Sequence, residues 1–124
     1  MTFFDTNILI YKSIKVLDES KYDTSKNLIA KHIISKEFTI SPLTLIEYIY
    51  ASKKLKIKTN DLTTDISFYS TYSYNDIESK MVIDSYHLAA QLNLERSIND
   101  LIHLKYAEKY CDKLITFDKG FKRL

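Results

Sequence analysis

Apolar residues occur along the chain both as short runs and as groups at helical spacing, and these two patterns predict its elements. The first run, at 2–4, predicts a strand, and the apolar positions in 7–14 predict a helix directly after it. A second helix is predicted over 25–36 and a short strand over 38–40. The Ser-Pro pair at 41–42 is a strong start signal for a third helix, because serine caps helices and proline suits their first position.

Boundaries between the elements are soft throughout the chain, because it has a single glycine and a single proline to mark its turns. Residues 67–74 alternate weakly between apolar and polar side chains and predict a strand. A helical region is predicted from 75 or 76 to about 94, and a further helix from 97 or 99 to about 110. Residues 113–117 predict a final strand that ends at Asp118. Strands and helices in this order predict an α/β fold, with a parallel sheet and helices on both faces.

Length and composition indicate a single globular domain, 1–124. The chain has 124 residues, of which 45% are hydrophobic and 27% charged, values that are typical of folded soluble proteins. The single cysteine, Cys111, excludes an internal disulfide and a cysteine-rich zinc site. No apolar run approaches the roughly 18 residues that a membrane span needs. We therefore expect a cytoplasmic protein without membrane association.

Four carboxylates stand at predicted strand ends or near predicted helix starts: Asp5, Glu47, Asp100 and Asp118. If the strands are parallel, the ends that carry Asp5 and Asp118 lie on one edge of the sheet, where open α/β sheets bind their ligands. Four acids that meet there would require a divalent cation, because like charges within a few ångströms cannot all stay ionised without one. Carboxylate oxygens suit Mg²⁺ or Mn²⁺. The pattern therefore predicts a metal-dependent phosphodiester hydrolase.

Each acid also has a purely structural interpretation. A single aspartate at a helix start is commonly a cap, whose oxygens accept backbone N–H bonds. Glu47 lies in the second turn of its predicted helix, where it cannot cap the helix, and its apolar neighbours indicate partial burial. A partly buried glutamate needs a partner, and a cation could serve as that partner. His103 stands three residues beyond Asp100 and can approach the same site on helical spacing. His32 and His87 are expected to pack or to lie at the surface.

Charge and aromatic residues fit a polyanionic partner. The net charge is +2, from 18 basic and 16 acidic residues, and setting aside the four acids above leaves 12 acidic residues against 18 basic ones. That excess suits a polyanion that approaches an acidic pit. Several tyrosines, which can stack on unpaired bases but more commonly fill cores and interfaces, occur close together. They are Tyr48, Tyr50, Tyr69, Tyr72 and Tyr74.

The same residues resemble a known family. The Phe-Asp-Thr-Asn motif at 4–7, Glu47 in a helix after a short strand, Asp100 opening a helix and the strand end at 114–118 resemble the PIN-domain nucleases. The resemblance is strongest to the VapC-type toxins of bacterial and archaeal toxin-antitoxin pairs, and it covers nearly the whole chain. It implies an α/β/α PIN-like domain with a short parallel sheet flanked by helices, and endonucleolytic cleavage of RNA.

The resemblance also implies the residues of the site and its partners. The catalytic and metal-binding residues would be Asp5, Glu47, Asp100 and Asp118, which would hold Mg²⁺ or Mn²⁺. Asn7 and Thr116 match positions that support the site by hydrogen bonding. A VapC-type toxin would form a homodimer and bind a cognate antitoxin that blocks the site. The chain ends six residues after Asp118, where members of the family usually add a further edge strand.

Two other interpretations remain open. The chain could be a catalytically silent PIN-like module that binds RNA or protein. It could instead be an Asp-based phosphatase with Asp5 as its nucleophile, which would form a covalent aspartyl-phosphate. The phosphatase interpretation leaves Glu47 without a role.

Overall fold

The computed structural model describes residues 1–93 and 97–123, so the predicted helix end at 94 lies outside the described residues. The predicted strands at 2–4, 38–40 and 113–117 are present, and among the described residues four helices follow one another between the second and the third of them. In chain order the elements are β1 (Thr2–Phe4), α1 (Thr6–Ser13), the 3₁₀ helix η1 (Lys15–Leu17), α2 (Glu19–Ile34), β2 (Phe38–Thr39), α3 (Pro42–Lys54), α4 (Thr59–Ser70), α5 (Ser79–Leu92), α6 (Ile98–Tyr110), β3 (Lys113–Ile115) and the 3₁₀ helix η2 (Lys119–Arg123).

The described strands form a three-stranded parallel sheet in the order β2-β1-β3. Thr2 of the central strand β1 lies opposite Phe38 of β2 and Lys113 of β3. All three strands therefore end on the same edge of the sheet. Asp5 directly follows β1, and Asp118 follows β3 by three residues, so the sheet brings these two acids to one edge as predicted.

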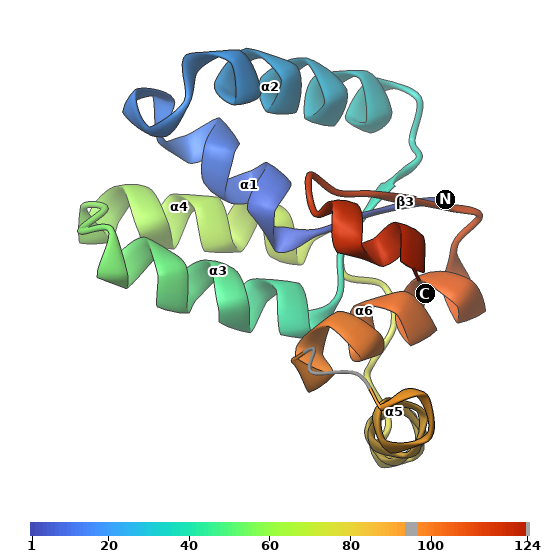
Figure 1. Ribbon diagram of the computed structural model, residues 1–124. Coiled ribbons are helices and arrows are strands. Elements are labelled where there is room, and N and C mark those ends of the chain that lie inside the picture. Colours follow the sequence, from blue (N-terminus) through green and yellow to red (C-terminus); the bar gives the residue numbers. More distant parts are fainter. Residues whose placement is uncertain (94–96, 124) are drawn as a thin grey trace.

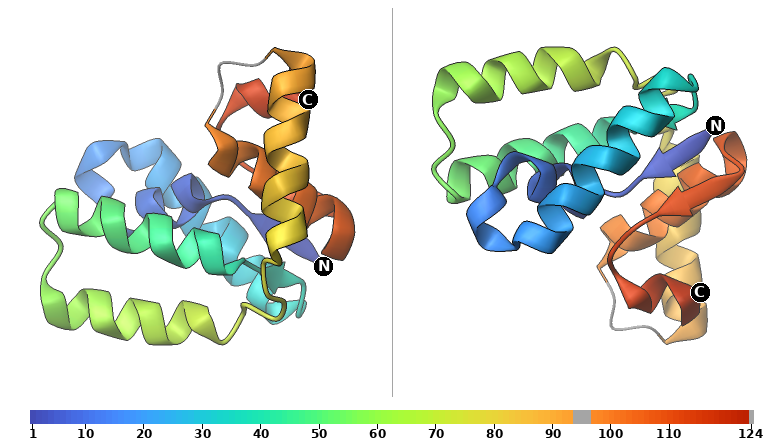
Figure 2. Two further views of the ribbon diagram at one scale, coloured as in Figure 1. Left: turned by 90° about the horizontal axis from the view of Figure 1, so that it is seen from below. Right: turned by 90° about the horizontal axis from the view of Figure 1, so that it is seen from above.

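Helices cover both faces of the sheet, because neighbouring side chains of β1 point to opposite sides. Phe4 packs into a core cluster with residues of α1, α2, α3 and α4. Phe3 packs on the other face with Met81 of α5 and Tyr106 of α6. Figure 1 shows α5 and α6 together at one end of the molecule, and Figure 2 shows α3 and α4 side by side. The predicted α/β/α architecture is confirmed.

Local sequence accounts for the starts of α3 and α6. The Ser41 side chain accepts a hydrogen bond of 3.2 Å from the Thr44 backbone N–H, and the Thr44 hydroxyl accepts one of 3.2 Å from the Ser41 N–H. This reciprocal capping box, with Pro42 at the first helical position, places Glu47 in the second turn of α3. Ser97 caps α6 by accepting from the Asn99 N–H at 3.2 Å.

The predicted strand at 67–74 is wrong. Residues up to Ser70 belong to α4, whose Leu62, Ile66 and Tyr69 recur at helical spacing and pack into the core on the Phe4 face of the sheet. The weak alternation at 67–74 is the last turn of this helix and the turn after it. The only bridge this segment makes to the described residues is the isolated one from Ser73 to Ile40.

Two predicted helix starts are also displaced. The helix predicted from 25 begins at Glu19, because the Asp18 carboxylate caps it by accepting from the Lys21 N–H at 3.0 Å. The helix predicted from 75 or 76 begins at Ser79. The Asn75 carbonyl instead accepts a hydrogen bond from the Tyr106 hydroxyl at 3.3 Å, which ties the loop before α5 to α6.

Candidate active site

Asp5 is both a helix cap and a buried carboxylate at the edge of the sheet. Its backbone N–H donates to the Ile115 carbonyl at 3.0 Å, which continues the pairing of β1 with β3. Its Oδ1 accepts from the Thr6 N–H at 2.7 Å and so caps α1. Its Oδ2 accepts from the Thr116 hydroxyl at 2.7 Å. The side chain is therefore held from two elements, and the residue is only 7% exposed.

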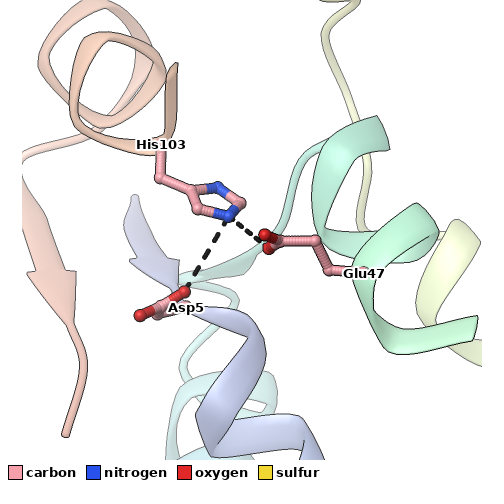
Figure 3. A group of neighbouring side chains, drawn as sticks. All are labelled: Asp5, Glu47 and His103. Atoms are coloured by element: carbon pink, nitrogen blue, oxygen red, sulfur yellow. Dashed lines mark hydrogen bonds and ion pairs between the residues drawn. The ribbon is translucent and has the colours of Figure 1, made fainter. Parts of the chain in front are cut away.

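Glu47 joins α3 to α1 and α6. Its Oε1 accepts a hydrogen bond of 2.6 Å from the Thr6 hydroxyl and lies 2.5 Å from Nε2 of His103. Its Oε2 accepts from the Asn99 side-chain amide at 3.1 Å. Figure 3 shows Asp5, Glu47 and His103 pointing toward one another from the end of β1, from α3 and from α6. This partly buried glutamate has the partners that its position requires.

The two carboxyls differ in how readily they ionise. Burial raises the pKa of Asp5, and this effect exceeds the hydrogen bond from Thr116 and the nearby His103, which both favour the charged form. Burial acts in the same direction on Glu47, but its hydrogen bond to His103 and the other donors around it outweigh burial and lower the pKa of Glu47. A nearby cation would therefore favour ionisation more at Asp5 than at Glu47.

Asn7 and Thr116 form a hydrogen-bonded link between α1 and the chain after β3. The side-chain Nδ2 of Asn7 donates to the Thr116 hydroxyl oxygen at 3.3 Å, and the side-chain Oδ1 of Asn7 accepts from the Phe117 N–H at 3.4 Å. The Thr116 oxygen also accepts from the Asp118 N–H at 2.9 Å. The structure places both residues beside the acids where the resemblance expects supporting groups.

All four predicted acids line one open pocket of about 590 Å³. They reach it from the end of β1, from α3, from α6 and from the segment after β3. One ligand atom each from Asp5, Glu47 and His103 lies within 4.8 Å of the others. The pocket also includes Tyr50. Carboxylate oxygens that converge in this way, one of them on a carboxyl with a raised pKa, fit a hard divalent cation such as Mg²⁺ or Mn²⁺.

The arrangement of strands, helices and acids agrees with comparisons to known proteins. The family model of the PIN domain matches residues 2–124. The chain belongs to the PIN domain family. The predicted family is thereby confirmed, whereas no curated protein matches the chain.

Two solved structures resemble this PIN domain in fold. The first is the structure of VapBC2 from Rickettsia felis bound to a DNA fragment from their promoter, with 24% identity and a TM-score of 0.66. The match covers 99% of this chain and 92% of that chain. The second is a toxin-antitoxin complex from Klebsiella pneumoniae, with 23% identity, a TM-score of 0.63 and coverage of 98% and 90%.

Three groups at the site of this PIN domain were given no definite role by the sequence. Thr6 and Asn99 both donate to Glu47. Each directly adjoins a predicted acid, and Thr6 also belongs to the Phe-Asp-Thr-Asn motif at 4–7. His103 was expected to be able to approach the site, and the structure places it in contact with Glu47.

Among the described residues, no helix has both the length and the apolar composition needed to cross a membrane.

Proposed function

We propose that this PIN domain is a metal-dependent endoribonuclease and acts as the VapC-type toxin of a toxin-antitoxin pair. The observation that carries the proposal is the convergence of Asp5, Glu47, Asp100 and Asp118 on one pocket. Family membership and the fold of the two toxin-antitoxin structures support it.

The four acids would hold Mg²⁺ or Mn²⁺, and a bound ion would supply an activated water and stabilise negative charge on the attacked phosphate. The protein residues supply position and charge. Thr116 holds Oδ2 of Asp5, and the donors around Glu47 keep that carboxylate ionised and oriented. Such a site needs no covalent protein nucleophile.

A single-stranded RNA fits the surroundings of the pocket. Tyr50, which is 69% exposed, lines the pocket and offers a ring on which an unpaired base can stack. Outside the four site acids the chain has more basic than acidic residues, and this excess of positive charge would attract the phosphate backbone. The other clustered tyrosines are not equally available, because Tyr48 and Tyr69 are buried in the core.

Partners follow from the same proposal. The two solved structures of similar fold are described as a VapBC and a toxin-antitoxin complex, which supports a cognate antitoxin for this chain. We propose that the antitoxin covers the pocket and that the toxin forms a homodimer in the cytoplasm. Ile46, which lines the pocket and is more than half exposed, offers an apolar contact for such a protein.

Cleavage of a labelled RNA pool tests the proposal. The purified protein is incubated with Mg²⁺, with Mn²⁺ and with a chelator, beside the Asp5→Asn variant and a matched Asp23→Asn control, which changes an exposed aspartate of α2. We expect metal-dependent cleavage by the wild type and the control, and loss of cleavage in Asp5→Asn. Unchanged cleavage by Asp5→Asn would refute the proposed site. RNA binding without cleavage under every metal condition would favour the silent module, and a covalent aspartyl-phosphate would favour the phosphatase.

A further inference from the structure

His103 is a buried polar side chain that faces the buried Asp5 and the partly buried Glu47. Its side chain is 1% exposed, and its ring packs against that of Phe3 with 5.4 Å between the ring centroids. Its Nε2 lies 2.5 Å from Oε1 of Glu47 and 3.9 Å from Oδ1 of Asp5. The ring therefore enters the site through one nitrogen only, as Figure 3 shows.

The other ring nitrogen decides which role His103 can take. Its Nδ1 is buried and has no hydrogen-bond partner among the described residues. A proton on Nε2 makes a hydrogen bond to a carboxylate, whereas a proton on Nδ1 would be a buried donor without an acceptor. A histidine that binds a metal through Nε2 must carry its proton on Nδ1, and it almost always donates that proton to a carboxylate, a carbonyl or a water. In the described part of the chain, the surroundings of Nδ1 lack that partner.

We propose that His103 is a positioning residue that orients Glu47 toward the ion, and is not itself a metal ligand. This inference rests on the proposed function. A carboxylate oxygen has two lone pairs, and on Oε1 of Glu47 they are taken by the Thr6 hydroxyl and by Nε2–H of His103. Within the described residues Oε2 accepts from Asn99 alone, which leaves a lone pair on that oxygen. With His103 in place the two oxygens of Glu47 therefore differ in role: Oε1 is held by protein hydrogen bonds, and Oε2 is the oxygen that binds the ion.

Two variants that carry the same amide group at different reach test whether His103 positions Glu47 or binds the ion itself. The Gln amide nitrogen in His103→Gln can reach the place of Nε2, whereas the Asn amide in His103→Asn is shorter by one methylene and reaches only the place of Nδ1. Mn²⁺ binding to the metal-free proteins is measured directly from the electron paramagnetic resonance signal of free Mn²⁺. We expect His103→Gln to keep the affinity within about threefold and His103→Asn to weaken it about 10–100-fold, the usual effect of losing a residue that orients a ligand.

The outcomes distinguish this inference from the proposed function. Equal, large losses in both variants would mean that the imidazole itself binds the ion, and unchanged affinity in both would mean that Glu47 needs no orientation from His103; either result overturns the inference alone. A wild-type protein that binds no Mn²⁺ would overturn the proposed function as well.

A second measurement does not depend on the variants folding. In the Mg²⁺-saturated wild type, ¹⁵N correlation spectra of the imidazole are expected to show the proton of His103 on Nε2. A proton on Nδ1, with Nε2 bound to the ion, would overturn the inference.

Discussion

The hydroxyl of Thr6 donates a hydrogen bond of 2.6 Å to Oε1 of Glu47, so that the first residue of α1 is joined to the second turn of α3. The backbone N–H of the same threonine donates to Asp5 at 2.7 Å. One residue therefore sets the spacing of two carboxylates that come from different elements.

Thr6→Val removes the hydroxyl while keeping the size and β-branching of the side chain. We expect Mn²⁺ affinity and RNA cleavage to fall about tenfold or more, since a group that orients a metal ligand is lost. Thr6→Ser, which keeps the hydroxyl, should stay close to the wild type in both measurements. Equal behaviour of Val and Ser in Mn²⁺ titrations would show that the Thr6 hydroxyl has no influence on the site.

Asp5→Asn is expected to change how the stability of the metal-free protein depends on pH. Burial raises the pKa of Asp5 in the folded state, so the stability that its protonated form contributes is present below the usual value of 3.8 and is lost as the pH rises through the raised folded value. Asparagine is neutral at every pH. Relative to the wild type, Asp5→Asn should therefore have a higher free energy of unfolding at pH 7 than at pH 4, on top of a pH-independent cost, because the amide has one acceptor oxygen where both oxygens of Asp5 accept hydrogen bonds.

Urea unfolding at both pH values, in chelator and in Mn²⁺, checks the Asp5→Asn prediction. In Mn²⁺ the wild type should gain stability over the variant, because an ion that binds only the folded wild type adds to its stability. A stability difference between the two proteins that is the same at pH 4 and pH 7 in chelator would contradict the expectation that the Asp5 charge is costly in the metal-free fold.

Tyr48 and Tyr69 pack edge to face in the core, with 5.4 Å between their ring centroids, but their hydroxyls differ. The Tyr48 hydroxyl donates to Asp65 at 2.8 Å and lies 2.6 Å from the Ser13 hydroxyl. The Tyr69 hydroxyl is buried with no hydrogen-bond partner among the described residues. We expect Tyr48→Phe to lower the free energy of unfolding by about 1–3 kcal/mol and Tyr69→Phe to leave it unchanged or raise it. Urea unfolding of both variants is the check, and a larger loss in Tyr69→Phe would contradict it.

Alkaline pH should destabilise the fold through Tyr48. Burial, together with the neighbouring Asp65 carboxylate, raises the pKa of Tyr48 from 10.0 to about 12. Because the folded value is the higher one, the contribution to stability is complete below pH 10 and is lost between pH 10 and 12. The free energy of unfolding of the wild type should fall more steeply in this window than that of Tyr48→Phe. Parallel curves for the two proteins would show that Tyr48 does not titrate in the folded state as expected.

The sequence predicted the parts of the fold that depend on local chemistry. Ser41 and Pro42 mark the start of α3 because a cap and a fixed backbone angle act within one turn. The run before Asp5 predicts β1 because a short apolar run that ends at a polar residue is typical of a buried strand. The prediction of a strand at 67–74 failed because a short amphipathic stretch suits a strand or a helix end equally well, and packing against α3 decides between the two.

The candidate site was predictable to a similar extent. The parallel order of β1 and β3 was enough to expect Asp5 and Asp118 at one edge. The partners of Glu47 could not be predicted, because its contacts with Thr6 and His103 span 41 and 56 positions of sequence. They depend on how α1, α3 and α6 pack. Helical spacing places His103 on the same side of α6 as Asp100 but does not show which acid it contacts.

The central position of β1 makes the site dependent on the order of synthesis. β1 is the first described strand to be made and β3 the last, and the hydrogen bond from Thr116 to Asp5 joins residues 111 positions apart. Contacts over such separations close late, because the chain entropy of a long loop must be overcome first. A nascent chain that has emerged only through α5 carries Asp5 and Glu47 but not Asp100 or Asp118. Under the proposed function, the ribosome that makes this chain would therefore not be exposed to a complete nuclease until β3 and the following segment with Asp118 have emerged.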